Sequence, residues 1–297
     1  MNLSIGNAPC SWGVEFADDP RNPPWTRVLD EAKAAGYRGI ELGPLGYMPE
    51  DQTILGPALA ERGLTLIGGV LFRPFHDPAQ WTEVKDATYR TCRALAAHGA
   101  QQLVLIDSIS PRRAPTAGRP QEAERLRGAE RDAFLERLRT VTRIGAEEFG
   151  LIVTMHAHAA GFVEFLDELE DVLQAIGPEL LGVCLDTGHS VYAGFDPVAF
   201  YRRHGERVRY LHFKDVNPKM LKDAIANRTG FYDACAAGVF CTLGEGCVDF
   251  LALKRALEET GFSGWGTIEQ DRDPKGARST LADATTNLNY LKSVGLA

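Results

Sequence analysis

Residues 181–189 read Leu-Gly-Val-Cys-Leu-Asp-Thr-Gly-His, an apolar run that ends in Asp186 and is followed by His189. A short apolar run closed by polar residues is typical of a strand that is buried on both faces. The arrangement recurs at Leu211-His212-Phe213-Lys214-Asp215, at Met155-His156-Ala157-His158 and at Thr267-Ile268-Glu269-Gln270-Asp271. The sequence therefore predicts four strand ends that each carry an imidazole, a carboxylate or both.

Eight apolar runs alternate with eight segments of helical periodicity along the chain. Regular alternation of this kind is typical of parallel strand–helix–strand units. The expected strands are Leu3–Ala8, Tyr37–Gly43, Leu64–Leu71, Gln102–Asp107, Leu151–His158, Leu181–Asp186, Val208–Lys214 and Gly264–Gln270. The expected helices are Trp25–Ala35, Thr53–Arg62, Ala79–His98, Glu130–Phe149, Phe162–Ile176, Asp196–His204, Phe250–Thr260 and Leu281–Val294.

Eight such units in 297 residues favour a (β/α)8 barrel over an open doubly wound sheet. No GxGxxG follows the first strand and no GxxxxGK[ST] occurs, so the nucleotide-binding folds lack their signature. Since no change in composition marks a boundary, we expect one TIM-barrel domain over residues 1–297. Two irregular segments interrupt the rhythm, 108–128 and 216–246, and the first is expected to be a functional or mobile loop.

The composition suits a globular enzyme, with 44% hydrophobic and 24% charged residues and a net charge of −8. This acidic balance gives no electrostatic reason to bind nucleic acid or an anionic membrane. No run of about 18 apolar residues is present, and the N-terminus lacks the features of a signal peptide. The six cysteines show no CxxC spacing, which favours free thiols and a cytoplasmic location.

The four predicted strand ends also predict a metal site. In a (β/α)8 barrel the carboxyl ends of the strands carry the chemistry, and four consecutive strands are neighbours. One imidazole or carboxylate from each can therefore reach one ion, giving a mixed nitrogen and oxygen site for Mn²⁺, Co²⁺, Mg²⁺ or Zn²⁺. The alternative at any single position is a core or capping group, but four unpaired buried polar groups would be costly.

Several further residues are candidates for contacts with a substrate. His189 could transfer protons or cap a helix, and Lys214 shares the inward face with His212, where a nearby cation would lower its pKa. Lys214 could instead pair with Asp215 or Glu41, and Glu41 could contact substrate. Trp12 could wall a sugar ring or pack in the core. The acidic loop that contains Glu245 argues for an unphosphorylated substrate.

The chain resembles a known enzyme family at three motifs. These are Leu185-Asp186-Thr187-Gly188-His189, His212-Phe213-Lys214-Asp215-Val216 and Gly244-Glu245-Gly246-Cys247-Val248-Asp249-Phe250. They resemble the xylose isomerase-like barrel superfamily of sugar isomerases, epimerases and dehydratases, and within it the inosose dehydratases. Two stretches depart from the dehydratase pattern: Ala159-Ala160-Gly161 stands where that pattern has Met-Gly-Thr, and segment 108–128 has no counterpart.

The resemblance implies a metal-dependent lyase that dehydrates a cyclic polyol ketone, such as 2-keto-myo-inositol, through a metal-stabilised enolate. Carried over by position, it implies the metal ligands His156, Asp186, His212 and Glu269, with Mn²⁺ or Co²⁺ as the expected ion. The candidates for base and acid are His158, His189 and Lys214, with Glu41 also on the catalytic side. The expected substrate contacts are Trp12, Asp215 and Glu245.

Other functions are compatible with the same residues. Isomerisation or epimerisation of a ketose would use the same enolate and keep the hydroxyl. Elimination on a 3-keto-glycoside would expel the aglycone, and the two long segments could build the larger pocket. A catalytically silent sugar-binding subunit would not need the full set of ligands. The net charge of −8 disfavours an endonuclease. The oligomeric state stays open, with a homo-oligomer as one expectation.

Overall fold

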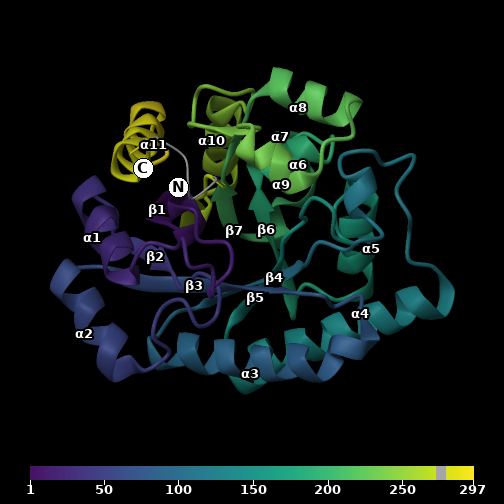
Figure 1. The fold of residues 1–297 in the computed structure, drawn as a ribbon, viewed down its shortest axis with the longest axis horizontal. Helices are drawn as coiled ribbons and strands as arrows, with labels where there is room; N and C mark the ends of the chain where they lie inside the picture. Colours follow the sequence, from purple (N-terminus) through teal and green to yellow (C-terminus); the bar gives the residue numbers. More distant parts are fainter. Residues whose placement is uncertain (272–278) are drawn as a thin grey trace.

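The chain folds as a single (β/α)8 TIM barrel in the computed structural model, which describes residues 1–271 and 279–297 (Figure 1). Eight strands close a cylinder in the order β1-β10-β7-β6-β5-β4-β3-β2, with neighbours parallel throughout. The barrel strands are β1 Asn2–Asn7, β2 Gly39–Glu41, β3 Thr65–Arg73, β4 Gln102–Asp107, β5 Ile152–Met155, β6 Leu181–Asp186, β7 Val208–Phe213 and β10 Ser263–Ile268.

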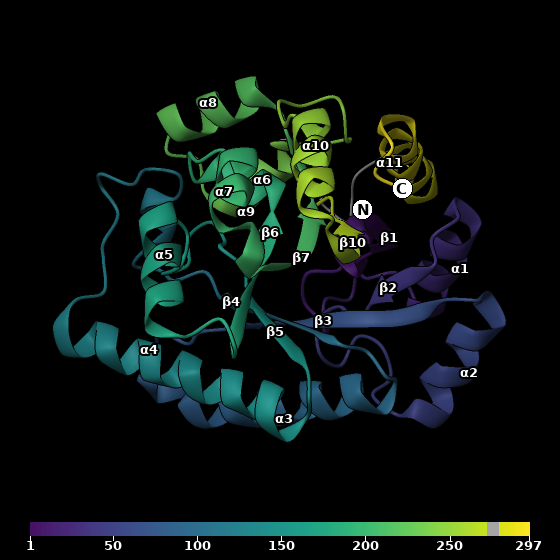
Figure 2. The ribbon, with the colours of Figure 1, turned by 180° about the vertical axis from the view of Figure 1, so that it is seen from behind.

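Helices surround the barrel, as the two views from opposite sides show (Figures 1 and 2). The helices are α1 Trp25–Ala35, α2 Gln52–Arg62, α3 Trp81–Ala97, α4 Gly128–Arg143, α5 Leu166–Ala175, α6 Thr187–Tyr192, α7 Pro197–His204, α8 Pro218–Ala226, α9 Phe231–Ala236, α10 Phe250–Thr260 and α11 Thr280–Val294. In the described part of the chain, no helix combines the length and the apolar character needed to cross a membrane. The two termini lie near each other, because β1 pairs with β10 and α1 packs on α11.

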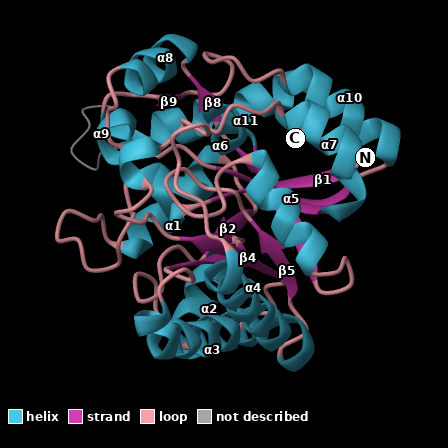
Figure 3. Cartoon of the chain, turned by 90° about the vertical axis from the view of Figure 1, so that its right-hand side faces the viewer, coloured by secondary structure: helices cyan, strands magenta, loops and turns pink. Residues whose placement is uncertain are grey.

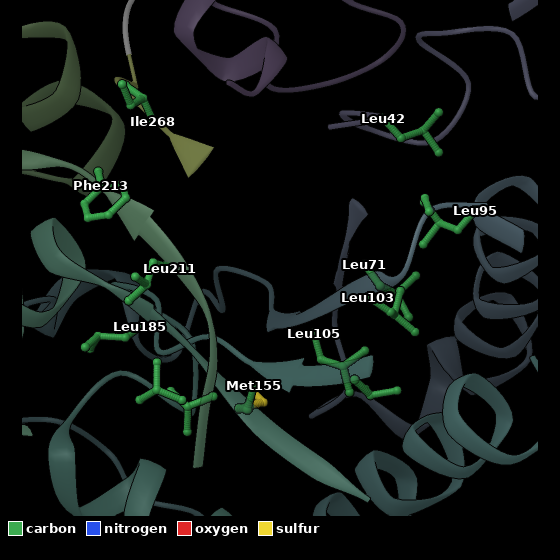
Figure 4. Packing of buried hydrophobic residues seen from close by; sticks show 14 of the residues in the cluster. Leu42, Leu71, Leu95, Leu103, Leu105, Met155, Leu185, Leu211, Phe213 and Ile268 are labelled. Atoms are coloured by element: carbon green, nitrogen blue, oxygen red, sulfur yellow. The ribbon is translucent and has the colours of Figure 1, made fainter. Parts of the chain in front are cut away.

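Side chains of the strands alternate between the helix layer and the barrel interior. The layer between strands and helices contains Leu103, Leu105, Met155, Leu185 and Leu211 (Figure 4). The positions between them point inward, where a smaller cluster of Ile67, Val104, Ile106, Cys184 and Tyr210 fills the barrel. The same alternation turns Asp186 and His212 inward, because they are neighbours of Leu185 and Leu211. The period of the strands thus decides which polar groups meet inside the barrel.

The structure corrects one of the two segments that were expected to be irregular, and it shows how the other is anchored. Residues 216–246 are not irregular: they hold α8, α9 and a two-stranded antiparallel sheet of β8 Asp215–Val216 and β9 Phe240–Cys241, which lie together at one end of the molecule (Figure 3). Segment 108–128 is anchored by Arg113, a fully buried guanidinium 3.0 Å from Glu164 and 2.5 Å from Glu168. It is therefore tied to the connection between β5 and α5.

Several element ends also differ from the predicted ones. Strand β5 stops at Met155, so His156 and His158 lie in the connection after the strand. The helix expected to reach Phe149 leaves α geometry at Ile144 and continues as one π-helical turn to Glu148. The third helix begins at Trp81 after a short 3-10 turn. By contrast, α1 ends at Ala35 as predicted, because Gly36 adopts φ +97° and closes the helix.

Candidate metal centre and active site

Four buried side chains at the carboxyl ends of consecutive barrel strands converge on one point. His156 follows β5, Asp186 ends β6, His212 lies in β7 and Glu269 follows β10. One nitrogen or oxygen atom from each lies within 4.8 Å of the others. Asp186 and His212 are register partners in adjacent strands, which fixes the first contact across the site. The structure brings together the four residues that the sequence suggested as ligands.

The two carboxylate oxygens of Asp186 have different partners. Oδ1 accepts a hydrogen bond of 2.6 Å from the backbone N–H of His189 and so caps α6. Oδ2 faces the centre, 3.3 Å from His156 Nε2 and 3.6 Å from Lys214 Nζ. A Cβ at Gly188 would lie 2.7 Å from Lys214 Cγ, so glycine lets α6 start this close to the centre. Asp186 is both a helix cap and a carboxylate directed at the centre.

A carboxylate behind His212 orients its imidazole. His212 Nε2 lies 3.0 Å from Glu41 Oε1, which also accepts a hydrogen bond of 2.8 Å from the Tyr210 hydroxyl. When Nε2 donates to Glu41, the lone pair is on Nδ1, which is 3.2 Å from Glu269 Oε2 at the centre. Carboxylates commonly hold metal-binding histidines in this way. Glu41, expected as a substrate contact or a lysine partner, lies behind His212 and also lines the cavity described below.

The polar atoms at this centre fit a divalent cation. Among the described residues, both ring nitrogens of His156, Oδ2 of Asp186 and Nδ1 of His212 have no hydrogen-bond partner. Their short mutual contacts therefore lack hydrogen-bond geometry. Each unsatisfied buried polar atom costs about 1–3 kcal/mol, which a shared cation would offset. Two imidazoles and two carboxylates form a donor set suited to Mn²⁺, Co²⁺ or Zn²⁺, with Mg²⁺ preferring more oxygen.

Lys214 is surrounded by three carboxylates. Its Nζ lies 2.9 Å from Asp271, 3.2 Å from Glu269 and 3.6 Å from Asp186. Burial lowers the pKa of Lys214, but these negative charges outweigh burial and raise the pKa well above its ordinary value. The lysine is therefore charged, and it pairs with Asp271 rather than with Asp215 or Glu41. The lowered pKa expected from the sequence would require an ion whose charge outweighs all three carboxylates.

The imidazoles of His158 and His189 stack beside the centre, with ring centroids 4.1 Å apart. Burial, together with the charges of His156 and Lys214, lowers the pKa of His158 to about 3. Burial and the charge of Lys214 hold the pKa of His189 well below its ordinary value. Both rings are therefore neutral near pH 7. Phe231 of α9 packs against both of them.

Two adjoining cavities lead to this centre. The inner cavity, of about 90 Å³, is lined by Glu41, His156, His158, Lys214, Glu269 and Asp271 among others. The outer cavity, of about 260 Å³, has aromatic walls from Phe16, Phe231 and Tyr232. Cys10, Glu15 and Asp271 line both, so the two share a wall. The segment 216–246 therefore contributes to the approach through α9.

The structure does not bring three expected substrate contacts to the cavities. Trp12 is 2% exposed in the hydrophobic core, and its indole N–H donates to Glu31 over 2.8 Å. Glu245 is exposed on the loop after β9. Asp215 faces that loop, where its carboxylate accepts hydrogen bonds from the backbone N–H groups of Val216, Gly244, Gly246 and Val248. These positions correct the expectation that the three residues line the substrate pocket.

Three residues that the sequence reasoning missed belong to the site. Asp271 lies two positions after Glu269 in the stretch Thr267 to Asp271. Residues two apart in extended backbone share one face, so the sequence did contain a signal for Asp271. Glu15 enters both cavities from the connection after β1. Tyr210 reaches Glu41 across the barrel. Tyr210 shares the inward face of β7 with His212, because the two are two positions apart, but no sequence pattern indicated that its partner is Glu41.

Comparison with known proteins places the chain in a family. Residues 29–294 match the family described as xylose isomerase-like TIM barrel. The chain belongs to this family. The chain is similar in sequence to the rhizopine catabolism protein MocC of Rhizobium meliloti. The two are 33% identical over 291 residues, which cover 93% of this chain and 84% of that protein. The inosose dehydratase of Geobacillus kaustophilus (strain HTA426) is 28% identical over 283 residues, covering 91% and 88%.

A solved structure extends the family likeness to the fold. The IOLI protein with a bound zinc atom superposes with a TM-score of 0.74 at 17% identity, covering 99% of this chain and 98% of that one. At this identity the superposition bears on the barrel alone. Together with the curated relatives, the family membership makes the chain an enzyme. The buried His/Asp/Glu cluster marks a candidate site for a divalent metal within it.

Proposed function

We propose that this protein is a metal-dependent lyase that dehydrates a cyclic polyol ketone, with 2-keto-myo-inositol as the leading substrate. The observation that carries the proposal is the convergence of His156, Asp186, His212 and Glu269 on one point. Two of these four residues, His156 and Glu269, line one cavity together with His158 and Lys214. The inosose dehydratase relative, aligned over 91% of the chain, supports the substrate class.

The donor set and its neighbours match what this reaction needs. An ion held by His156, Asp186, His212 and Glu269 would act as a Lewis acid toward substrate oxygens. The chain itself supplies the proton chemistry: a base must take the proton α to the ketone, and an acid must protonate the departing β-hydroxyl. His158, His189 and Lys214 lie close enough to the centre to serve. Glu41 keeps His212 in the tautomer that a ligand requires.

The charges around the cavities favour an uncharged substrate. Asp271, Glu269 and Glu15 line the inner cavity with Lys214, whose ammonium is already shared by three carboxylates. A phosphate or carboxylate on the substrate would meet these negative groups at close range. The hydroxyl groups of a polyol or keto-sugar can instead donate hydrogen bonds to these carboxylates and accept one from Lys214. The proposed substrate is therefore neutral and rich in hydroxyl groups.

The test is turnover by the purified protein after metal removal and reloading with Mn²⁺, Co²⁺, Mg²⁺ or Zn²⁺. With 2-keto-myo-inositol we expect a product that has lost one water and absorbs in the ultraviolet as a dione. A product of unchanged mass would show isomerisation or epimerisation instead. Release of an aglycone from a 3-keto-glycoside would show the third reaction. If 2-keto-myo-inositol gives no product with any one of the four metals, the dehydratase assignment is wrong.

A further inference from the structure

We propose that the backbone of Ala159 sets the two stacked imidazoles in opposite hydrogen-bonding states, so that His158 presents a proton acceptor to the substrate and His189 presents an N–H donor. The proposal rests on the proposed function for the identity of the substrate, but the states of the two rings stand on the structure alone. It separates two residues that the sequence could not tell apart.

The carbonyl of Ala159 decides the state of His158. Nδ1 of His158 lies 2.9 Å from the Ala159 carbonyl oxygen. A carbonyl oxygen only accepts hydrogen bonds, so Nδ1 must carry the hydrogen. In the neutral ring, Nε2 then has a free lone pair. Since His158 lines the inner cavity, this lone pair belongs to the side chain that can accept a proton there.

The amide of Ala159 decides the state of His189 in the opposite sense. The Ala159 N–H donates to Nδ1 of His189 over 3.2 Å. An Nδ1 that accepts a hydrogen bond carries no hydrogen, so the ring is neutral and its hydrogen is on Nε2. Within the described residues, this Nε2 is buried without a hydrogen-bond partner. The nearest carboxylate oxygen, on Asp271, is 3.8 Å away, which is beyond hydrogen-bond distance. The unpartnered N–H thus lies beside Asp271, which lines both cavities, and we place the substrate oxygen that would accept from it on this side.

The turn that carries Ala159 is held in an uncommon conformation. Ala160 has φ +65°, a left-handed conformation that non-glycine residues rarely adopt and that costs about 1–3 kcal/mol. Backbone hydrogen bonds fix the turn on both sides: Ser110 N–H donates to the Ala160 carbonyl, and His158 N–H donates to the Val163 carbonyl. This uncommon conformation therefore lies directly after Ala159, whose carbonyl contacts one ring and whose N–H contacts the other. This placement gives the Ala159-Ala160-Gly161 stretch a function.

The two states assign different roles in the dehydration. His158 Nε2 takes the proton α to the ketone, and the electron pair of the C–H bond remains on the substrate as an enolate. His189 donates a hydrogen bond to a substrate oxygen and keeps its proton, because losing it would leave an imidazolate. The proton on His158 then passes to the β-hydroxyl, the C–O bond breaks, and water leaves. Both rings end in their starting states, so no further reactant is needed.

The first test reads the tautomers directly and needs no substrate. Protein labelled with ¹⁵N-histidine is examined by long-range ¹H–¹⁵N NMR, with and without Zn²⁺, and the two rings are assigned by their loss in His158→Gln and His189→Gln. We expect the hydrogen on Nδ1 in His158 and on Nε2 in His189. Identical tautomers, or the reverse assignment, would overturn the proposal even if the protein turns over none of the ketones.

The second test measures exchange of the α-proton of 2-keto-myo-inositol with D₂O. His158→Gln should lower the exchange rate by about 100-fold or more, because an amide cannot take the proton. His189→Gln retains an N–H donor and should stay within about tenfold of wild type, whereas His189→Leu should lose about 100-fold or more. All variants are checked for bound Zn²⁺ and for thermal unfolding. Exchange retained in His158→Gln, or equal losses in His189→Gln and His189→Leu, would contradict the assignment.

Discussion

His212 shows how a single residue can depend on a carboxylate distant in the sequence. Its Nε2 faces Glu41 at 3.0 Å, and its Nδ1 faces the centre at 3.2 Å from Glu269. The imidazole is therefore held at one nitrogen and offered at the other. Glu41 lies 171 residues away along the chain and reaches His212 from β2, which is three strands from β7 around the closed barrel. Only closure of the sheet brings the two together.

Replacing Glu41 tests this orientation. In Glu41→Gln the charged acceptor is lost, so the ring of His212 should no longer be fixed in the tautomer that frees Nδ1. We expect the affinity for Zn²⁺ or Mn²⁺ to fall by about 10–100-fold, the usual effect of removing a partner of a metal-binding histidine. Calorimetric titration of metal-free protein measures this. Tyr210→Phe is the matched control, because it removes a hydrogen bond to Glu41 and leaves the Glu41–His212 contact; an equal loss there would argue against the orienting role.

Glu15 predicts a dependence of stability on pH. Burial, reinforced by the charge of Asp271, raises the pKa of Glu15 from 4.5 to about 7. The folded protein thus holds this proton more tightly than the unfolded chain, so stability falls as pH rises from about 4.5 to 7. Glu15→Gln lacks this loss. The difference in free energy of unfolding between Glu15→Gln and wild type should therefore be about 2–3 kcal/mol larger, in favour of the variant, at pH 8 than at pH 5.

Urea unfolding of metal-free protein at the two pH values measures the effect of Glu15. The nearby exposed carboxylate of Asp18 supplies the control, since Asp18→Asn should follow the wild-type pH dependence. A constant difference between Glu15→Gln and wild type at both pH values would show that the Glu15 carboxyl is not perturbed by its surroundings. Glu15, which lines both cavities, would then be ionised at neutral pH.

At the scale of elements, the loop after β9 is organised by one carboxylate. Asp215 receives four backbone N–H groups, at 2.9 Å from Val216 and Gly244 and at 3.0 Å from Gly246 and Val248. A Cβ at Gly246 would lie 2.2 Å from Asp215 Oδ1, so the glycine is needed for this approach. The motif His-Phe-Lys-Asp and the motif Gly-x-Gly are therefore two halves of one structure, although the sequence suggested a substrate contact.

Removing the Asp215 carboxylate should destabilise the protein without affecting the centre directly. Hydrogen bonds to a charged acceptor contribute about 1.5–3 kcal/mol each, so Asp215→Ala should lower the free energy of unfolding by at least about 3 kcal/mol. Denaturant unfolding monitored by circular dichroism measures this. Glu245→Ala changes an exposed acid in the same loop and should have an effect below about 0.5 kcal/mol. Similar effects of the two variants would mean that Asp215 does not hold the loop.

The elements that the sequence predicted best are those with local signals at both ends. Helix α10 matches the predicted Phe250–Thr260, because Gly261 ends it, and β6 matches the predicted Leu181–Asp186, because a short apolar run there is closed by polar residues. The segment 216–246 was misread because α8 and α9 are short and are stabilised by a small cluster of their own around Phe231 and Phe240. Short helices with few residues facing the main core leave little periodicity to detect.

At the scale of the whole molecule, the site has one part that can be predicted from the sequence and another that depends on how the barrel closes. His156, Asp186, His212 and Glu269 come from consecutive strands, so strand order and period two are enough to bring them together. Contacts across the barrel are different, because they depend on its diameter and on which side chains fill it. The pair of Glu41 and Tyr210 belongs to this second class.

The four strands that supply the candidate ligands also predict that metal binding stabilises the whole fold. An ion held by β5, β6, β7 and β10 binds only the folded chain, so a concentration about 100 times Kd should add about 2.7 kcal/mol. For a protein of this size that is a rise in Tm of about 4 °C, measured by calorimetry before and after EDTA treatment. Asp186→Asn should abolish the metal-dependent rise, whereas His204→Gln, which changes a histidine paired with Glu170 outside the centre, should retain it. A rise of equal size in Asp186→Asn would place the ion elsewhere, because the remaining three residues no longer span all four strands.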